Sequence, residues 1–72
     1  MSKLATIART GEKATEVGLK SDAVAQDLLN AAGISLRKGE VLEREGEVID
    51  LETSIENGDV VFVTEDDTNG GR

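Results

Sequence analysis

The residues best suited to covalent chemistry lie at the C-terminus, where the sequence reads Glu65-Asp66-Asp67-Thr68-Asn69-Gly70-Gly71-Arg72. Gly70 and Gly71 have no Cβ, so they can adopt any backbone conformation and leave an acyl carbon unhindered toward a nucleophile. The chain contains no His and no Cys. Thiol catalysis, thiolate zinc sites and disulfides are therefore excluded, and a nucleophile–base pair would need unusual side chains. We expect that the protein is not itself an enzyme.

The same terminal residues also have simpler interpretations. A Gly-Gly near a terminus can be an unstructured end or a remnant added at the terminus. Asp66 and Asp67 could meet a hard cation, but two adjacent carboxylates on a flexible segment bind it weakly, so a solvated acidic tail is the simpler view and we expect no bound metal or cofactor. The function of the tail therefore depends on the elements that precede it.

Length and composition limit the architecture. A chain of 72 residues is long enough for one domain, which at this size buries roughly 60% of the surface of the unfolded chain. Because Phe62 is the single aromatic residue, the core must be built from Val, Ile, Leu and Ala. The longest purely apolar run is Val60 to Val63, so neither a signal peptide nor a membrane span is expected. We expect a soluble, cytoplasmic protein without a membrane partner.

Charge is distributed unevenly along the chain. Through Gly39 there are six basic and four acidic residues, and from Glu40 onward there are eleven acidic and two basic residues, so balances of +2 and −9 sum to the net charge of −7. An acidic half repels phosphate backbones, which argues against a nucleic-acid partner. It favours a basic partner surface, although the charge could simply keep the domain soluble.

The first half of the sequence predicts a hairpin followed by a helix. Residues 3–9 and 13–20 look extended, and Gly18 falls inside the second run, where a glycine often marks a bulge. Residues 22–32 place their apolar side chains on one helical face, with Ser21 as the expected N-cap and Gly33 as the expected end.

The second half predicts short strands and a free tail. Residues 41–44 and 48–51 are strand candidates, and Asn57-Gly58 predicts a tight turn. The unbroken run of β-branched and aromatic residues at 60–64 predicts a central strand covered on both faces and placed beside the first strand. Residues 65–72 contain no apolar side chain, which predicts a flexible tail. We therefore expect an α+β domain at 1–64, with a mixed four- to five-stranded sheet and one crossing helix, and a tail at 65–72.

These elements and the tail resemble a known family. The run Gly46 to Val63, which contains Asn57-Gly58-Asp59 before the last strand, followed by Gly70-Gly71, is similar to the second half of the ubiquitin-like sulfur carriers of thiamine and molybdopterin synthesis. The order of elements resembles the ubiquitin-like β-grasp family over nearly the whole chain. The most specific part is residues 55–63 together with the two glycines.

The resemblance implies a function for the tail. In the family, an activating enzyme uses ATP and Mg²⁺ to adenylate the terminal glycine carboxylate, which passes to sulfur as a thiocarboxylate, or to a Cys and then to an amine. Gly71 and Gly70 would be the residues of activation. Glu65, Asp66, Asp67, Thr68 and Asn69 would guide the tail into the partner, the acidic ones by attraction to a basic entrance.

Arg72 departs from the family pattern, because a carrier ready for activation ends at the second glycine. The chain therefore resembles a precursor that a peptidase must cleave between Gly71 and Arg72. Two branches stay open: a protein modifier, with a conjugating enzyme and lysines of target proteins as partners, or a sulfur carrier, with a sulfur-transfer enzyme. The alternative from another class is a non-covalent β-grasp interaction module with an inert tail.

Overall fold

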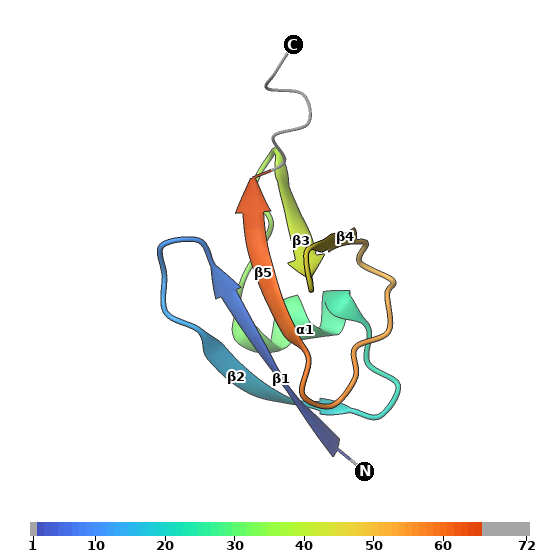
Figure 1. Cartoon of the computed structure of the whole chain (residues 1–72). Coiled ribbons are helices and arrows are strands. Elements are labelled where there is room, and N and C mark those ends of the chain that lie inside the picture. Colours follow the sequence, from blue (N-terminus) through green and yellow to red (C-terminus); the bar gives the residue numbers. More distant parts are fainter. Residues whose placement is uncertain (1, 66–72) are drawn as a thin grey trace.

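The computed structural model describes residues 2–65 of the chain, which form one helix and five strands (Figure 1). In chain order the elements are β1 (Ser2–Arg9), β2 (Thr15–Lys20), α1 (Ala25–Ala32), β3 (Glu40–Arg44), β4 (Glu47–Ile49) and β5 (Val60–Glu65). Each predicted element is present within one to three residues of its expected limits. β5 continues through Glu65, which the sequence analysis assigned to the tail.

All five strands form one mixed sheet in the order β2-β1-β5-β3-β4. β5 pairs in parallel with β1, with Thr6 opposite Val60 and Arg9 opposite Val63. On its other side β5 pairs antiparallel with β3, where Leu42 lies opposite Val63. The expectation that the closing strand lies beside the first strand in the middle of the sheet is confirmed.

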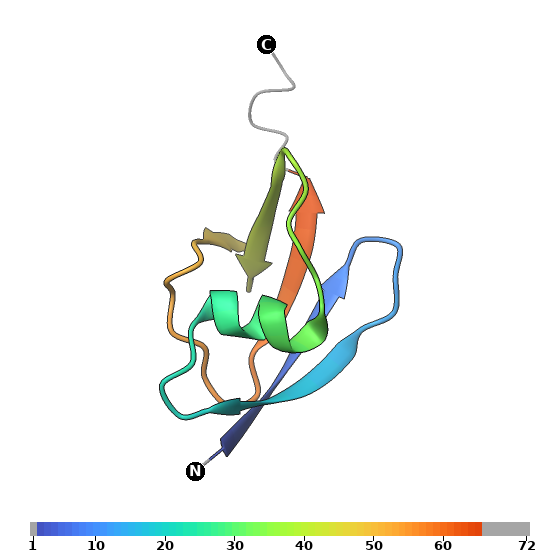
Figure 2. The same ribbon diagram turned by 180° about the vertical axis from the view of Figure 1, so that it is seen from behind.

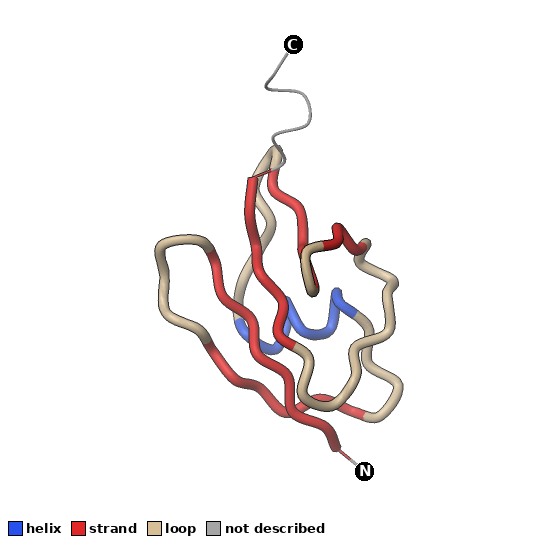
Figure 3. The backbone as a smooth tube through the Cα atoms, in the orientation of Figure 1, coloured by secondary structure: helices blue, strands red, loops and turns tan. Residues whose placement is uncertain are grey.

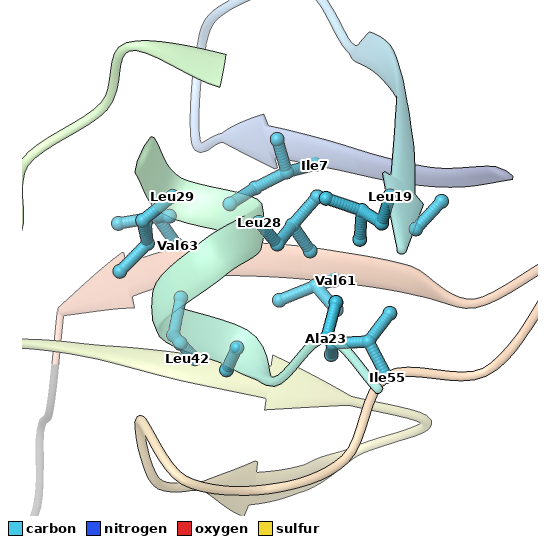
Figure 4. Close-up of a cluster of buried hydrophobic side chains, with 11 residues drawn as sticks. Ile7, Leu19, Ala23, Leu28, Leu29, Leu42, Ile55, Val61 and Val63 are labelled. Carbon is cyan, nitrogen blue, oxygen red and sulfur yellow. The ribbon is translucent and has the colours of Figure 1, made fainter. Parts of the chain in front are cut away.

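The helix α1 covers one face of the sheet, as the view from behind shows (Figure 2). A long connection links β4 to β5 and passes close to the start of α1 (Figure 3), where Ala25 N donates to Thr53 O and Ile55 N donates to Ala23 O. The core lies between sheet and helix (Figure 4) and contains no buried polar side chain among the described residues. Its largest fully buried side chains are Ile7, Leu28, Leu42, Ile55, Val61 and Val63.

The helix starts three residues later than the sequence predicted. Its N-cap is Val24, and the Asp27 carboxylate accepts a hydrogen bond from the Val24 amide at 2.9 Å. Ser21 is not the cap, because Ala23 N donates to Lys20 O in a turn and Val24 forms a β-bridge with Ser54. Contacts with residues 53–55 therefore override the local capping preference. The prediction that Gly33 ends the helix is confirmed by its φ of 74°.

β5 is not covered on both faces, which corrects a second expectation. Its side chains alternate: Val61 and Val63 are fully buried, whereas Val60 and Phe62 are 45% and 48% exposed. A single helix can cover only one face of a single sheet, so the outward side chains of even the central strand stay in contact with solvent. The unbroken apolar run at residues 60–63 thus marks a strand with an exposed apolar face.

The tight turn predicted at Asn57-Gly58 is present before β5, but only one of the two residues has the positive φ that an Asn-Gly turn was expected to supply. Asp59 N donates to Glu56 O at 3.0 Å, and Gly58 has φ of 89°, as the third position of a type II turn requires. Asn57 does not have positive φ. Its side-chain oxygen instead accepts a hydrogen bond from Leu4 N at 2.9 Å, which ties the turn to β1.

Candidate functional site

The site residues predicted from the sequence lie outside the described residues. This applies to the activation residues Gly70 and Gly71, to Arg72, to the guiding residues Asp66, Asp67, Thr68 and Asn69, and to the predicted flexibility of the tail. The structure places the residue from which this segment starts. Glu65 is the last residue of β5, in the middle of the sheet and at the end where both β1 and β5 terminate.

Neighbouring strands hold the end of β5 on both sides. Thr10 N and Thr10 Oγ1 donate to Val63 O at 3.1 and 3.2 Å, which continues the pairing beyond the end of β1. On the β3 side, Val41 pairs with Thr64 and Glu40 with Glu65. The segment 66–72 therefore begins from a strand whose position is fixed up to its last residue.

A partly buried ion pair stabilises this end of the sheet. Arg9 Nη2 lies 3.1 Å from Glu40 Oε1, and the two side chains are only 13% and 9% exposed. The same Glu40 oxygen accepts a hydrogen bond from Arg37 N at 2.7 Å, and Arg9 Nη2 also donates to Ser35 O at 2.6 Å. The ion pair thereby joins β1, the connection after α1 and β3 directly beneath the end of β5.

The electrostatics of Glu40 follow from these contacts. The hydrogen bond from the Arg37 backbone amide is the main cause that lowers the pKa of the Glu40 carboxyl, and the Arg9 guanidinium acts in the same direction against the opposing effect of burial. Beside the ion pair lies an open hollow of about 380 Å³, lined by acidic and basic side chains that include Glu12, Arg37 and Glu65. This end of the sheet is polar and mixed in charge.

The outer face of the sheet carries an apolar patch that the sequence analysis missed. We define the outer-face patch as Leu4, Val48, Val60 and Phe62, which are between 45% and 62% exposed. Phe62 lies between Ala8 on β1 and Glu43 on β3, and Val48 on β4 lies opposite Glu43. The signal that could have revealed the patch is the single predicted helix, because it leaves alternate residues of each central strand without cover.

Metal-binding clusters and membrane-spanning helices are not found in the part of the chain that the structure describes. Across residues 2–65 no group of three or more acidic side chains is placed to hold a metal ion, and α1 is too short to cross a membrane. The candidate site therefore consists of the anchored end of β5 and the outer-face patch, which share the strand β5.

Comparison with known protein structures identifies the fold. SAMP1, a small archaeal modifier protein from Haloferax volcanii, superposes with a TM-score of 0.73 at 17% identity, and the match covers 93% of this chain and 99% of that one. The ubiquitin of Caldiarchaeum subterraneum superposes with a TM-score of 0.68 at 14% identity, covering 97% of this chain and 100% of the other. The chain has a ubiquitin-like β-grasp fold.

Other neighbours with this β-grasp fold include the UBL domain of Plasmodium falciparum Dsk2, with a TM-score of 0.66 at 16% identity over 92% of this chain and 100% of that one. No protein-family model matches the sequence, and no curated protein matches it significantly. The structural neighbours confirm the fold that was predicted from the order of elements. At these identities the similarity concerns the fold, while the function depends on the chain's own residues.

Proposed function

We propose that this β-grasp protein is a ubiquitin-like modifier or sulfur carrier that acts through the carboxylate of Gly71 and is not itself an enzyme. The observation that carries the proposal is a combination: the fold is ubiquitin-like, β5 is anchored up to Glu65, and Gly70-Gly71 follows within six residues. Similar folds in a small archaeal modifier protein and in an archaeal ubiquitin support it.

The spacing between β5 and Gly71 sets a limit on the partner. The six residues from Asp66 to Gly71 can span at most about 20 Å when fully extended. The active site of an activating enzyme must therefore lie within that distance of Glu65, and the enzyme must also contact the folded domain. The outer-face patch is suited to that contact, because Phe62 and Val60 lie on the same strand as Glu65.

In the proposed reaction sequence a peptidase first hydrolyses the amide bond between Gly71 and Arg72, which removes Arg72 and leaves a Gly71 carboxylate. A carboxylate oxygen then attacks the α-phosphorus of Mg²⁺-bound ATP in the activating enzyme, and pyrophosphate leaves. Because glycine has no side chain, the resulting acyl adenylate is open to a nucleophile. We assign Glu65, Asp66, Asp67, Thr68 and Asn69 to guiding this segment into the enzyme.

Two fates of the acyl adenylate remain in the proposal. In the modifier branch, a cysteine thiolate displaces AMP to give a thioester, and the amine of a target lysine then displaces the thiolate to give an isopeptide bond. In the sulfur-carrier branch, sulfide supplied by a sulfur-transfer enzyme displaces AMP and leaves a thiocarboxylate. We propose a cytoplasmic location for both branches, and neither branch requires a nucleic acid or a membrane.

The experiment that tests activation is ATP–pyrophosphate exchange with the activating enzyme of the same organism. Three forms are compared: the chain ending at Arg72, the chain ending at Gly71, and the chain ending at Gly70. We expect exchange only with the form ending at Gly71. Equal exchange by all three forms, or none with any of them, would contradict activation at Gly71.

The outer-face patch supports a second candidate function, a non-covalent interaction module. In that case the patch would bind the partner and the C-terminal residues would be inert. Truncation separates the two candidates: removal of residues 70–72 abolishes a function that requires Gly71, whereas it leaves binding through Phe62 unchanged. Replacement of Phe62 by Ser would abolish binding by an interaction module, and it would also weaken the contact with an activating enzyme, so the truncation is the variant that separates the two candidates.

A further inference from the structure

No conformation or contact among the described residues explains why residue 18 in β2 is a glycine. The described glycines at the turns and at the helix end, Gly11, Gly33, Gly39, Gly46 and Gly58, all have positive φ, whereas Gly18 does not. A Cβ built at Gly18 would meet no atom within 4 Å. The pairing of β2 with β1 also continues through Leu4 opposite Gly18, so the predicted bulge is absent.

A glycine inside a strand weakens the strand, and it often marks a bulge, a tight bend or a place where a ligand or another backbone approaches closely. β2 lies at one edge of the sheet, where one side of its backbone is left without a strand partner. It has six residues, compared with three in the opposite edge strand β4. β2 is therefore the longer open edge of the described sheet.

The outward side chains of β2 have a self-complementary arrangement. Glu16, Gly18 and Lys20 share the outer face, because they lie opposite Thr6, Leu4 and Ser2 on β1 in steps of two residues. All three are exposed, and neither of the two ion pairs found in residues 2–65 involves Glu16 or Lys20. The outer face of β2 thus presents one negative and one positive charge, equally spaced from a glycine.

We propose that β2 pairs antiparallel with β2 of a second copy of this chain, with Gly18 on the two-fold axis. In this register Glu16 of each copy lies opposite Lys20 of the other, so two cross-strand ion pairs form. On the opposite face Val17 lies opposite Leu19 of the second copy. A shift of two residues in either direction would place Gly18 opposite Glu16 or Lys20 and break both ion pairs.

The position of residue 18 on the two-fold axis explains why this residue is a glycine. Any side chain at residue 18 would face an identical side chain, and a charged one would face its own charge, which is unfavourable for directly opposed residues. The charge of the strand itself also permits the approach, since Glu16 and Lys20 are the charged residues of β2 and their charges cancel. The pairing does not involve the C-terminal residues, so it is independent of activation at Gly71.

The expected dimer is weak, because about five residues of each chain pair and the buried area is far below that of stable interfaces. We expect a Kd on the order of 0.1 to 1 mM. Sedimentation velocity on the full chain over this concentration range measures the association. Amide chemical shifts in ¹⁵N-labelled protein should move with concentration mainly in residues 15–20.

Charge reversal tests the register. Glu16→Lys alone and Lys20→Glu alone each place like charges opposite each other twice, so each variant should remain monomeric at about 1 mM. An equimolar mixture of the two variants restores both opposite-charge pairs and should associate again. Gly18→Lys should also prevent association, while its melting temperature should equal or exceed that of the wild type because a side chain there meets no neighbour.

Matched controls use the same charge changes at exposed residues away from β2, namely Glu52→Lys and Lys38→Glu. These variants should associate as the wild type does. The proposal is overturned if the wild type stays monomeric at 1 mM, if both charge-reversed variants associate normally, or if the mixture fails to associate. Concentration-dependent shifts centred on Phe62 instead of β2 would assign self-association to the outer-face patch and would also overturn it.

Discussion

Buried and exposed side chains alternate along β5, and this can be tested by making the same substitution at two adjacent valines. Val→Thr keeps the shape of the side chain and replaces a methyl group with a hydroxyl, so it measures burial without creating a cavity. Val61 is fully buried, whereas Val60 is 45% exposed on the outer face. The two variants therefore place the same hydroxyl on opposite faces of one strand.

The expected magnitudes follow from the core. The Val61→Thr hydroxyl would enter a core without buried polar side chains among the described residues, and an unsatisfied buried polar group costs about 1 to 3 kcal/mol. At Val60 the hydroxyl stays in water, so the change should be within about 0.5 kcal/mol. A domain of this size changes its Tm by roughly 4 to 8 °C per kcal/mol, so Val61→Thr should lower the Tm by roughly 10 °C.

The assay is urea unfolding followed by far-ultraviolet circular dichroism, because the chain has no Trp or Tyr to report by fluorescence. A thermal melt of each variant gives the Tm. Equal losses of stability for Val60→Thr and Val61→Thr would refute the assignment of one covered and one open face. The native fold of each variant should be checked from its amide spectrum before unfolding is compared.

Three further tests concern the start of α1, the Arg9–Glu40 ion pair and the turn before β5. Asp27→Ala removes the acceptor for the Val24 amide at the start of α1 and should cost about 1 kcal/mol in urea unfolding, whereas Ser21→Ala should cost little because Ser21 is not the cap. The pKa of the Glu40 carboxyl is lowered in the folded state, so its contribution to stability is present above the unfolded pKa and is lost as pH falls through the folded pKa. Glu40→Gln should therefore reduce the difference between the urea midpoints at pH 7 and pH 3. An unchanged difference would contradict this role. Gly58→Val introduces a β-branched residue at φ of 89° and should lower the Tm, while Gly18→Val should not, and equal effects would contradict the distinction between the two glycines.

The order of elements could be predicted because local signals and topology agree. Gly33 ends α1 as expected: Gly33 N donates to Asn30 O and Ile34 N donates to Leu29 O, the hydrogen bonds of a Schellman motif. The central place of β5 followed from its apolar character, since a strand of this kind is unfavourable at an edge. These features depend on residues close in sequence or on simple rules of sheet topology.

The expectations that were wrong depended on contacts between distant segments. The start of α1 is set by hydrogen bonds to residues 51–53 and by the bridge between Val24 and Ser54, which no local capping pattern contains. The exposure of Phe62 depends on the number of layers in the fold rather than on the strand itself. The Arg9–Glu40 ion pair joins residues 31 positions apart, and neither residue has a distinctive neighbour in sequence.

The chemistry assigned to Gly70 and Gly71 remains a prediction from the sequence, because these residues lie beyond Glu65, where the described part of the chain ends. The fold that precedes them agrees with the proposal, and so does the anchoring of β5. The same fold is compatible with a non-covalent interaction module. The state of the C-terminus in the cell therefore separates the two candidates.

Intact-mass spectrometry of the protein isolated from its own cells tests the central proposal most directly. The proposal predicts loss of Arg72 in a fraction of the molecules, together with either replacement of one oxygen by sulfur or branched conjugates joined through Gly71. The first form would establish a sulfur carrier and the second a protein modifier. A single unmodified species that still ends in Arg72 would contradict activation at Gly71 and would favour the interaction module.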